Sequence, residues 1–151
     1  MLVLDSKVPP PVVIFVMALF MLLISQAAPS LHFDLPGHKW LAAFVIVAGF
    51  VTGISGELTF RKANTTTNPM KPHASSLVTW GVYAKSRNPM YLGGIMLLGW
   101  AIYLLNVLAF LFLPLYVLYI NRFQIGPEER VLTSLFGEVF VAYQSSTRRW
   151  L

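Results

Sequence analysis

Apolar residues occur in long runs along this chain, and polar residues collect between the runs. The apolar runs cover residues 12–28, 40–56 and 88–121. With their flanks, the first two are long enough to cross a bilayer core, which requires about 20 helical residues. The third run would measure roughly 50 Å as one helix, at ~1.5 Å per residue, and this exceeds a core of about 30 Å even with tilt. The third run therefore predicts a hairpin of two short membrane helices.

The hairpin should turn near Leu105-Asn106, and Pro114 should kink its second leg. Residues 128–143 then repeat apolar side chains at helical spacing, opposite charged ones, which predicts an amphipathic helix along the membrane surface or over the bundle. Trp150 is expected to anchor the tail at the membrane interface. The predicted fold class is an all-α integral membrane protein with four transmembrane helices, including a C-terminal helical hairpin, plus a C-terminal amphipathic helix.

Composition supports a membrane protein. Hydrophobic residues make up 56% of the chain and charged residues 11%, and soluble domains usually carry about a quarter charged residues. The chain has no cysteine, which excludes disulfides, thiolate metal sites and a cysteine nucleophile. The triple proline Pro9-Pro10-Pro11 and the uncharged run behind it favour a retained first helix over a cleaved signal peptide.

The basic residues predict the orientation in the membrane. With four spans, the N-terminus, the connector of residues 59–87 and the segment after the hairpin share one side. Every Lys and Arg except Lys39 falls on that side. By the positive-inside rule that side, with both termini, is cytoplasmic. Because the basic residues form no run or helix face, we expect no nucleic-acid partner. The minimal loops and the absence of cysteine suit a bacterial inner membrane.

The first polar cluster stands where the connector enters the third span. In Arg87-Asn88-Pro89, the proline suits a first helical turn and Asn88 suits the N-cap. The free N–H groups of a helix start can receive a carboxylate, and Tyr91 follows one turn on. The alternative is structural, a capped helix with an arginine and a tyrosine at the interface.

The second cluster, Glu128-Glu129, begins the helix that follows the hairpin, so both clusters should lie on one membrane face. Acidic residues in a first turn are also favoured by the helix dipole, which is the structural alternative. Because adjacent carboxylates point in different directions, at most one is expected to share a pocket with Arg87 and Tyr91. Glu57 is more suited to an ion pair with Arg61, one turn on, than to catalysis.

Histidine placement argues against a metal site. His32 and His38 fall on the outer side and His73 in the connector, so no two histidines share a helix at facing depth. We therefore expect neither a metal nor a haem.

Several motifs occur in a characteristic order over residues 65–151. They are Thr65-Thr66-Thr67-Asn68-Pro69, Leu77-Val78-Thr79-Trp80-Gly81-Val82-Tyr83, Arg87-Asn88-Pro89-Met90-Tyr91-Leu92-Gly93, Glu128-Glu129, and Phe136-Gly137-Glu138 with Tyr143. In this order they resemble the isoprenylcysteine carboxyl methyltransferase family and its phospholipid methyltransferase relatives. From its length the chain is expected to form one domain over residues 1–151, with two N-terminal membrane helices in residues 1–58. The resemblance implies a cofactor-binding core in residues 59–151.

The resemblance also implies an enzyme that uses S-adenosyl-L-methionine in a cytoplasm-facing pocket. Its partners would be the bilayer and a lipophilic or lipid substrate bearing a carboxylate, amine or thiol. The implied cofactor-binding residues are Leu77, Val78, Tyr83, Asn88, Pro89, Tyr91, Glu128 and Glu129. The implied catalytic residues are Arg87, Tyr91, Arg122 and Gln124.

Two departures from the family pattern leave the acceptor open. Asn88 stands where the eukaryotic prenylcysteine enzymes have histidine. Gln124 stands where those enzymes have a substrate-contacting arginine, and Arg122 lies two positions earlier. The methyl-transfer chemistry therefore carries over better than the substrate. Two other functions compete, an NADPH-dependent membrane reductase of related fold and a non-enzymatic four-helix membrane protein. Polar groups concentrate at the cytoplasmic rim, which favours an interfacial active site over a translocation path.

Overall fold

The computed structural model describes residues 8–66 and 76–151. Its helices are α1 (Pro10–Ala27), α2 (His38–Lys62), α3 (Pro89–Leu97), α4 (Trp100–Leu104), α5 (Val107–Phe110), α6 (Phe112–Ile120), α7 (Gly126–Phe136) and α8 (Glu138–Ser146). Two short 3-10 turns, η1 (Pro29–Leu31) and η2 (Gly81–Ala84), and a π-helical segment, η3 (Asn121–Ile125), complete the helical elements of these ranges. Lys71, His73 and the Thr67-Asn68-Pro69 part of the first motif lie outside the described residues.

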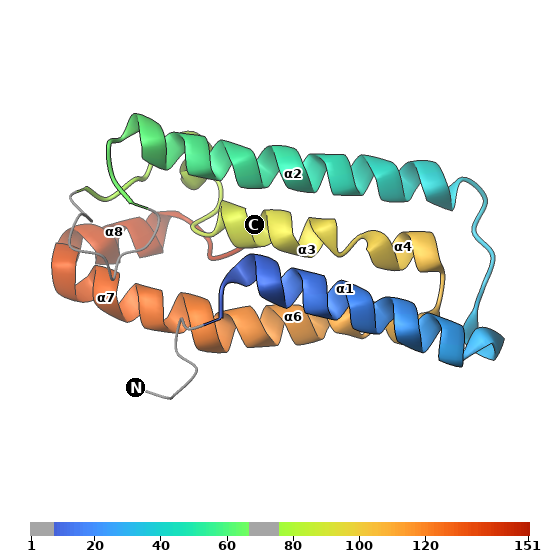
Figure 1. Ribbon diagram of the computed structural model, residues 1–151. Helices are drawn as coiled ribbons and strands as arrows, with labels where there is room; N and C mark the ends of the chain where they lie inside the picture. Colours follow the sequence, from blue (N-terminus) through green and yellow to red (C-terminus); the bar gives the residue numbers. More distant parts are fainter. Residues whose placement is uncertain (1–7, 67–75) are drawn as a thin grey trace.

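Four helical segments run lengthwise through the molecule (Figure 1). The helix α1, the helix α2 and the run Val107–Phe136 are each long and apolar enough to cross a membrane. The fourth segment, Pro89–Leu104, is a shorter apolar run that forms the first leg of the hairpin. The predicted fold class, an all-α membrane protein with four spans, is confirmed.

The hairpin turns at Leu105 and Asn106, as the length of its apolar run predicted. Leu105 adopts a left-handed conformation with φ of 49°, and its carbonyl accepts a 3.0 Å hydrogen bond from the backbone N–H of Phe33. The fully buried Asn106 caps α5 by accepting from the backbone N–H of Leu108 at 3.0 Å. Its side-chain amide donates to the carbonyl of Ala28 at 2.8 Å. The tip is thus fastened to the loop between α1 and α2.

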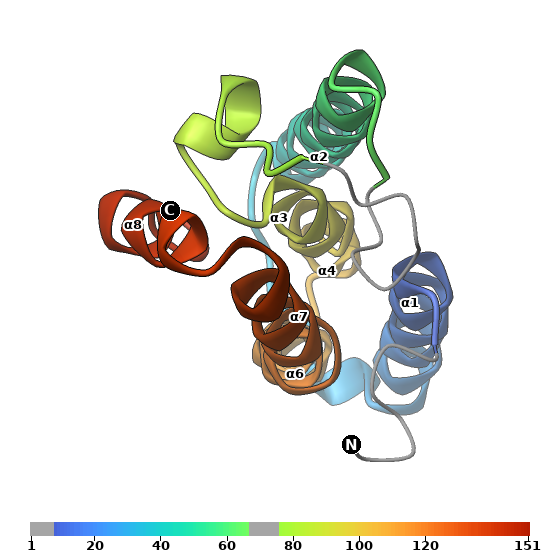
Figure 2. The ribbon, with the colours of Figure 1, turned by 90° about the vertical axis from the view of Figure 1, so that its left-hand side faces the viewer.

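The first leg of the hairpin lies in the middle of the bundle, between α1, α2 and the α6–α7 leg (Figure 2). The backbones of α2 and α3 approach closely, and a Cβ atom added at Gly93 would lie 2.7 Å from the carbonyl oxygen of Gly49. Small residues permit such an approach between membrane helices. The hydrophobic core of the bundle includes the fully buried Leu98, which follows α3, and Tyr116 and Ile120 of α6.

Two local features differ from the prediction. Residues 128–143 form two helices instead of one, because Gly137, with φ of 52°, separates α7 from α8. The helix α7 also continues the second leg of the hairpin directly through η3. Leu111 interrupts the second leg between α5 and α6, within one turn before Pro114, whose missing N–H cannot continue the helical hydrogen bonds.

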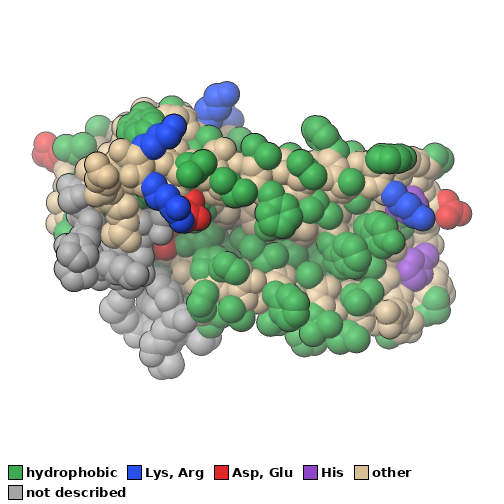
Figure 3. Space-filling model, turned by 45° about the horizontal axis from the view of Figure 1, so that its top comes forward, with side chains coloured by type: hydrophobic (Ala, Val, Ile, Leu, Met, Phe, Trp, Pro, Cys, Tyr) green, Lys and Arg blue, Asp and Glu red, His purple; other side chains and the backbone are tan. Residues whose placement is uncertain are grey.

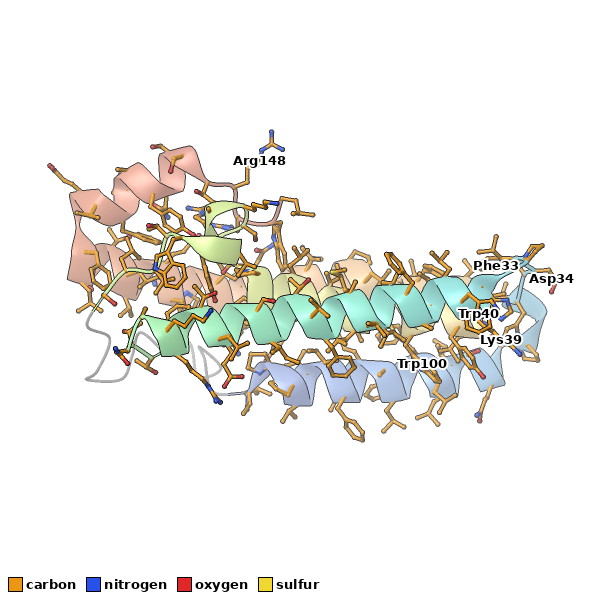
Figure 4. All side chains as sticks on the ribbon, turned by 90° about the horizontal axis from the view of Figure 1, so that it is seen from above. Phe33, Asp34, Lys39, Trp40, Trp100 and Arg148 are labelled. Atoms are coloured by element: carbon orange, nitrogen blue, oxygen red, sulfur yellow. The ribbon has the colours of Figure 1, made fainter. Side chains whose placement is uncertain are left out.

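Charged side chains concentrate at the two ends of the molecule, and the middle is apolar (Figure 3). At the end of the hairpin tip, Asp34 and Lys39 lie beside the exposed Trp40, whereas Arg148 lies toward the opposite end (Figure 4). The described Lys and Arg residues other than Lys39 belong to the elements of that opposite end. This end carries the candidate site.

Candidate active site

The start of α3 is held by the last residues of the chain. Asn88 occupies the N-cap position, but its side chain makes no capping hydrogen bond, so that expectation is wrong. Its Nδ2 instead donates to the carbonyl of Arg149 at 2.9 Å, and the backbone N–H of Arg87 donates to the carbonyl of Arg148 at 3.0 Å. The tertiary contact replaces the local cap.

The indole of Trp150 extends this contact to the other leg of the hairpin. Its Nε1 donates to Oδ1 of Asn121 at 3.3 Å, and the ring packs against the bundle core. Trp150 therefore fastens the tail to the protein, and its role as an anchor at the membrane interface stays a prediction. Residues 147–151, called here the C-terminal tail, connect the two ends of the hairpin.

Both carboxylates of the second cluster contact residues of the first cluster. The hydroxyl of Tyr91 donates to Oε1 of Glu128 at 2.7 Å, which joins α3 to α7. Glu129 forms ion pairs with Arg87 at 3.4 Å and with Arg149 at 2.6 Å. The expectation that at most one carboxylate shares a pocket with Arg87 and Tyr91 is wrong, because the cavity reaches both sides of the first turn of α7.

Two tyrosines join η2 to α8. The hydroxyl of Tyr143 donates to the backbone carbonyl of Tyr83 at 2.7 Å, and both side chains are buried. Burial raises the pKa of the Tyr143 hydroxyl to about 12, while the positive charge of Arg87 acts in the opposite direction. Burial also raises the pKa of Tyr83 well above its usual range. Both hydroxyls are therefore protonated at neutral pH, and the Tyr143 hydroxyl can serve as the hydrogen-bond donor.

The π-helical segment η3 decides where Arg122 and Gln124 point. Gln124 is buried, and its Nε2 donates to the carbonyl of Val8 at 2.7 Å, which ties the segment before α1 to the site. Arg122 is exposed, and its guanidinium carbon lies 5.5 Å from the ring centroid of Phe123. π-Helical turns add a residue to a helix and occur often at functional sites. Only Gln124 of this pair borders the cavity.

These groups surround a cavity of about 560 Å³. Nine of the eleven predicted cofactor-binding and catalytic residues line it, namely Leu77, Val78, Tyr83, Arg87, Asn88, Tyr91, Gln124, Glu128 and Glu129. Arg122 does not line it, and neither does the buried Pro89, which begins α3. Arg61 pairs with Glu57 at 2.6 Å, as expected, and Glu57 lies at the cavity edge.

The sequence reasoning missed the walls that α1 and α2 supply. Ile14 and the prolines before it line one side, and Gly49, Phe50 and Gly53 line the other. Apolar side chains that face a cavity look the same in sequence as apolar side chains that face lipid. The one available signal was the spacing of glycines in α2, since small residues at helical intervals mark a closely packed face.

Comparison with known proteins shows the family to which the chain belongs. The model of the family described as phospholipid methyltransferase matches residues 38–139, about two thirds of the chain. The chain belongs to the phospholipid methyltransferase family. The match begins at the first residue of α2 and ends inside α8, so it contains every residue singled out as a candidate for the site.

An uncharacterised protein of Haemophilus influenzae is also similar. It is 44% identical over 63 residues, which are 41% of this chain and 100% of the relative. Membership in the phospholipid methyltransferase family indicates methyl transfer as the reaction to test at the cavity. The long apolar helices that surround the cavity are consistent with a lipid-type substrate. In the described ranges no three His, Cys, Asp or Glu side chains are grouped as a metal site would require.

Proposed function

We propose that this protein transfers a methyl group from S-adenosyl-L-methionine to a lipophilic or amphipathic acceptor at the cytoplasmic face of a bacterial inner membrane. One observation carries the proposal: a single cavity combines a polar end at the Tyr91–Glu128 pair with an apolar extension between α1 and α2. A methyltransferase that acts on a membrane-embedded molecule needs both environments. Family membership favours this reading over the reductase and the non-enzymatic alternative.

The residues at the polar end fit the methyl donor. A volume of about 560 Å³ lies within the range of small-molecule sites, roughly 300–1,000 Å³. The carboxylate of Glu128, fixed by Tyr91, suits an ammonium group or a ribose hydroxyl. The backbone at Leu77 and Val78 suits an adenine edge, and the face of Tyr83 suits a base or a sulfonium.

The apolar extension suits the acceptor. The helices α1 and α2 each pack against α3, and the cavity wall between them includes Ile14, Phe50 and Ile54. Phe50 and Ile54 keep more than half of their surface exposed, so the cavity wall that they form is open. An acceptor can therefore enter sideways from the bilayer, while the donor arrives from water.

The protein has a limited chemical task. S-adenosyl-L-methionine supplies a methyl group already activated on a sulfonium. Tyr91 and Glu128 orient the bound methyl donor, and Phe136 and Phe140 exclude water at the α7–α8 side of the cavity. Arg87 lines the same cavity and is available to contact the acceptor. Holding two reactants in line accounts for much of the rate enhancement of a bimolecular transfer.

The test is calorimetric titration of the purified protein in detergent with S-adenosyl-L-methionine and, separately, with NADPH. We expect the former to bind and the latter not to bind. Tyr91→Phe removes only the hydroxyl, and Glu128→Gln removes only the charge. Since a hydrogen bond to a charged group is worth about 1.5–3 kcal/mol, each variant should weaken donor binding by about tenfold or more.

Two matched substitutions serve as controls. Tyr103→Phe makes the same change in α4, at the hairpin-tip end, and Glu138→Gln makes the same change at the exposed start of α8. Both should bind the donor like the unchanged protein. Unaltered affinity in Tyr91→Phe and Glu128→Gln would remove the assignment of the polar end to the donor.

A further inference from the structure

The helix α8 forms one wall of the cavity from the edge of the bundle, on the side away from α1 (Figure 2). Two of its side chains, Phe140 and Tyr143, are buried and line the cavity. Val139 and Val141, on either side of Phe140, are each more than half exposed. The helix packs against α7, from which Gly137 separates it. It therefore covers the cavity from outside and is not enclosed by the bundle.

Gly137 has the properties of a hinge. Its φ of 52° and ψ of -127° belong to a region of backbone conformation that glycine adopts readily and other residues rarely do. It is exposed, and a Cβ atom added there would meet no atom of the described chain within 4 Å beyond its immediate neighbours. Hinges are a few residues at the ends of elements that absorb changes in φ and ψ. The helix α8 can therefore rotate against α7 without a clash at the joint.

The far end of α8 is held by the C-terminal tail. Nε and one terminal nitrogen of Arg149 donate to the two oxygens of Glu129 at 3.2 and 2.6 Å. The carbonyls of Arg148 and Arg149 accept the hydrogen bonds from Arg87 and Asn88 described above. Glu129, Arg87 and Asn88 all line the cavity, whereas none of the described tail residues does. The tail thus fastens α8 to the cavity wall from outside.

The ion pair in this fastening can exchange its cation. Removing the partner of a buried carboxylate is normally costly. Glu129 is only 15% exposed, but Arg87, itself 12% exposed, lies 3.4 Å from it and stays there if Arg149 leaves. Nε of Arg87 is buried and has no hydrogen-bond partner in the part of the chain that the structure describes, so it has a donor in reserve for a closer pair. Arg149 is 42% exposed, and water can solvate it. Glu129 therefore keeps a cation beside it whether the tail is attached or released.

We propose that α8 and the C-terminal tail form a flap over the α7–α8 side of the cavity, hinged at Gly137 and latched by the Arg149–Glu129 ion pair. Release of the latch moves Phe140 and Tyr143 away from the cavity and admits molecules from water, and its closure excludes water. The flap follows from the geometry alone. Its use as the entrance of the methyl donor rests on the proposed function.

The test measures access to the cavity from water. The chain has no cysteine, so a single introduced thiol reports on its own position. Val78→Cys places a thiol on the cavity wall, at a residue that is only 4% exposed, with little change in side-chain volume. The full-length protein in phosphatidylcholine nanodiscs is treated with an uncharged methanethiosulfonate reagent that carries a short polyethylene glycol chain. The rate of modification is followed by mass spectrometry, without the methyl donor.

In this background, Arg149→Gln should raise the rate of modification by about fivefold, the effect of losing one partly exposed ion pair. Arg149→Lys keeps the charge and should restore part of the protection. Arg148→Gln is the matched control, because it removes the same charge from an exposed neighbour that is absent from the cavity wall. It should react like the protein that carries Val78→Cys alone.

Salt provides a test that leaves the latch unmutated, so the inference can be refuted even if Arg149→Gln does not fold. Sodium chloride at about 1 M limits electrostatic interactions between exposed charges to roughly 3 Å. It should accelerate modification when Arg149 is present and have little further effect in Arg149→Gln. Equal rates in all variants at both salt concentrations would overturn the flap. Equal acceleration by Arg149→Gln and Arg148→Gln would overturn the latch, because it would reflect net charge alone.

A second measurement tests the use of the flap as an entrance. Stopped-flow binding of S-adenosyl-L-methionine, followed by tryptophan fluorescence, should show faster association and faster dissociation in Arg149→Gln than in Arg148→Gln. A residue that only stabilises the site would change dissociation and leave association unaltered, and that result would refute the entrance. Faster thiol modification in a protein that does not bind S-adenosyl-L-methionine would support the flap and refute the proposed function.

Discussion

The contact between α2 and α3 predicts a large difference between two glycine-to-alanine substitutions. In Gly93→Ala, the new Cβ atom would lie 2.7 Å from the carbonyl oxygen of Gly49 and 2.9 Å from the backbone nitrogen of Gly53. Ordinary contact begins at 3.4 Å, so the helices must separate by about 0.7 Å. Both obstructing atoms are backbone, which cannot move aside as a flexible side chain does.

The expected cost is about 1–3 kcal/mol, the usual range for overpacking a well-packed interface. Gly53→Ala is the matched control on the facing helix. A Cβ atom there meets no heavy atom within 4 Å, and alanine has the higher helix propensity. The control should therefore leave the free energy of unfolding within about 0.5 kcal/mol of the unchanged protein, or raise it.

Reversible unfolding by sodium dodecyl sulfate in mixed micelles, followed by circular dichroism, measures both variants. Gly93→Ala should shift the midpoint to a lower fraction of the denaturant, and Gly53→Ala should not. Because Gly93 also lines the cavity, donor affinity should fall in Gly93→Ala. If the two variants unfold at the same midpoint, the close approach of the two helices is not as described.

Two further predictions concern the hairpin tip and the tyrosine contact. Asn106→Ala removes the cap of α5 and the hydrogen bond to Ala28, and should lower the free energy of unfolding by about 2 kcal/mol in the same assay. A change below about 0.5 kcal/mol would contradict the buried tip. The pKa of Tyr143 is raised to about 12 in the folded protein, from about 10 in the unfolded chain, so its stabilising contribution is complete below pH 10 and is lost as the pH rises toward 12. The free energy of unfolding should therefore fall less steeply over this interval in Tyr143→Phe than in the unchanged protein, and equal slopes would refute the shift.

The hairpin could be predicted because its cause is local and geometric. An uncharged run of 34 residues between Arg87 and Arg122 is too long for one span, so it must turn. The turn brings residues near positions 88 and 128 back to the same membrane face. The structure places Tyr91 against Glu128 for that reason.

The features that could not be predicted depend on tertiary contacts. Asn88 has the right residue type for a cap, but the carbonyl of Arg149, 61 positions away, competes for its amide. The apolar spacing of residues 128–143 continues across Gly137, so the pattern gave no sign of the break between α7 and α8. A glycine inside a helical pattern is a weak signal by itself.

The π-helical segment η3 is a third such case. The apolar pattern of the second leg continues through it, yet it leaves Gln124 against Val8 and Arg122 on the surface. Sequence spacing alone treated the two residues as equal candidates for acceptor binding. We propose that Gln124 instead fixes the wall of the cavity, and that the whole chain works as one domain because α1 and α2 complete that cavity.

The unequal lengths of α1 and α2 have a consequence for the surrounding bilayer. The 18 residues of α1 span about 27 Å and the 25 residues of α2 about 37 Å, on either side of a typical hydrocarbon core of about 30 Å. Lipids adapt to a short helix by local thinning of the leaflet. We therefore expect the leaflet to be thinner next to α1, and under the proposed function this would shorten the distance that an acceptor must rise out of the membrane to react.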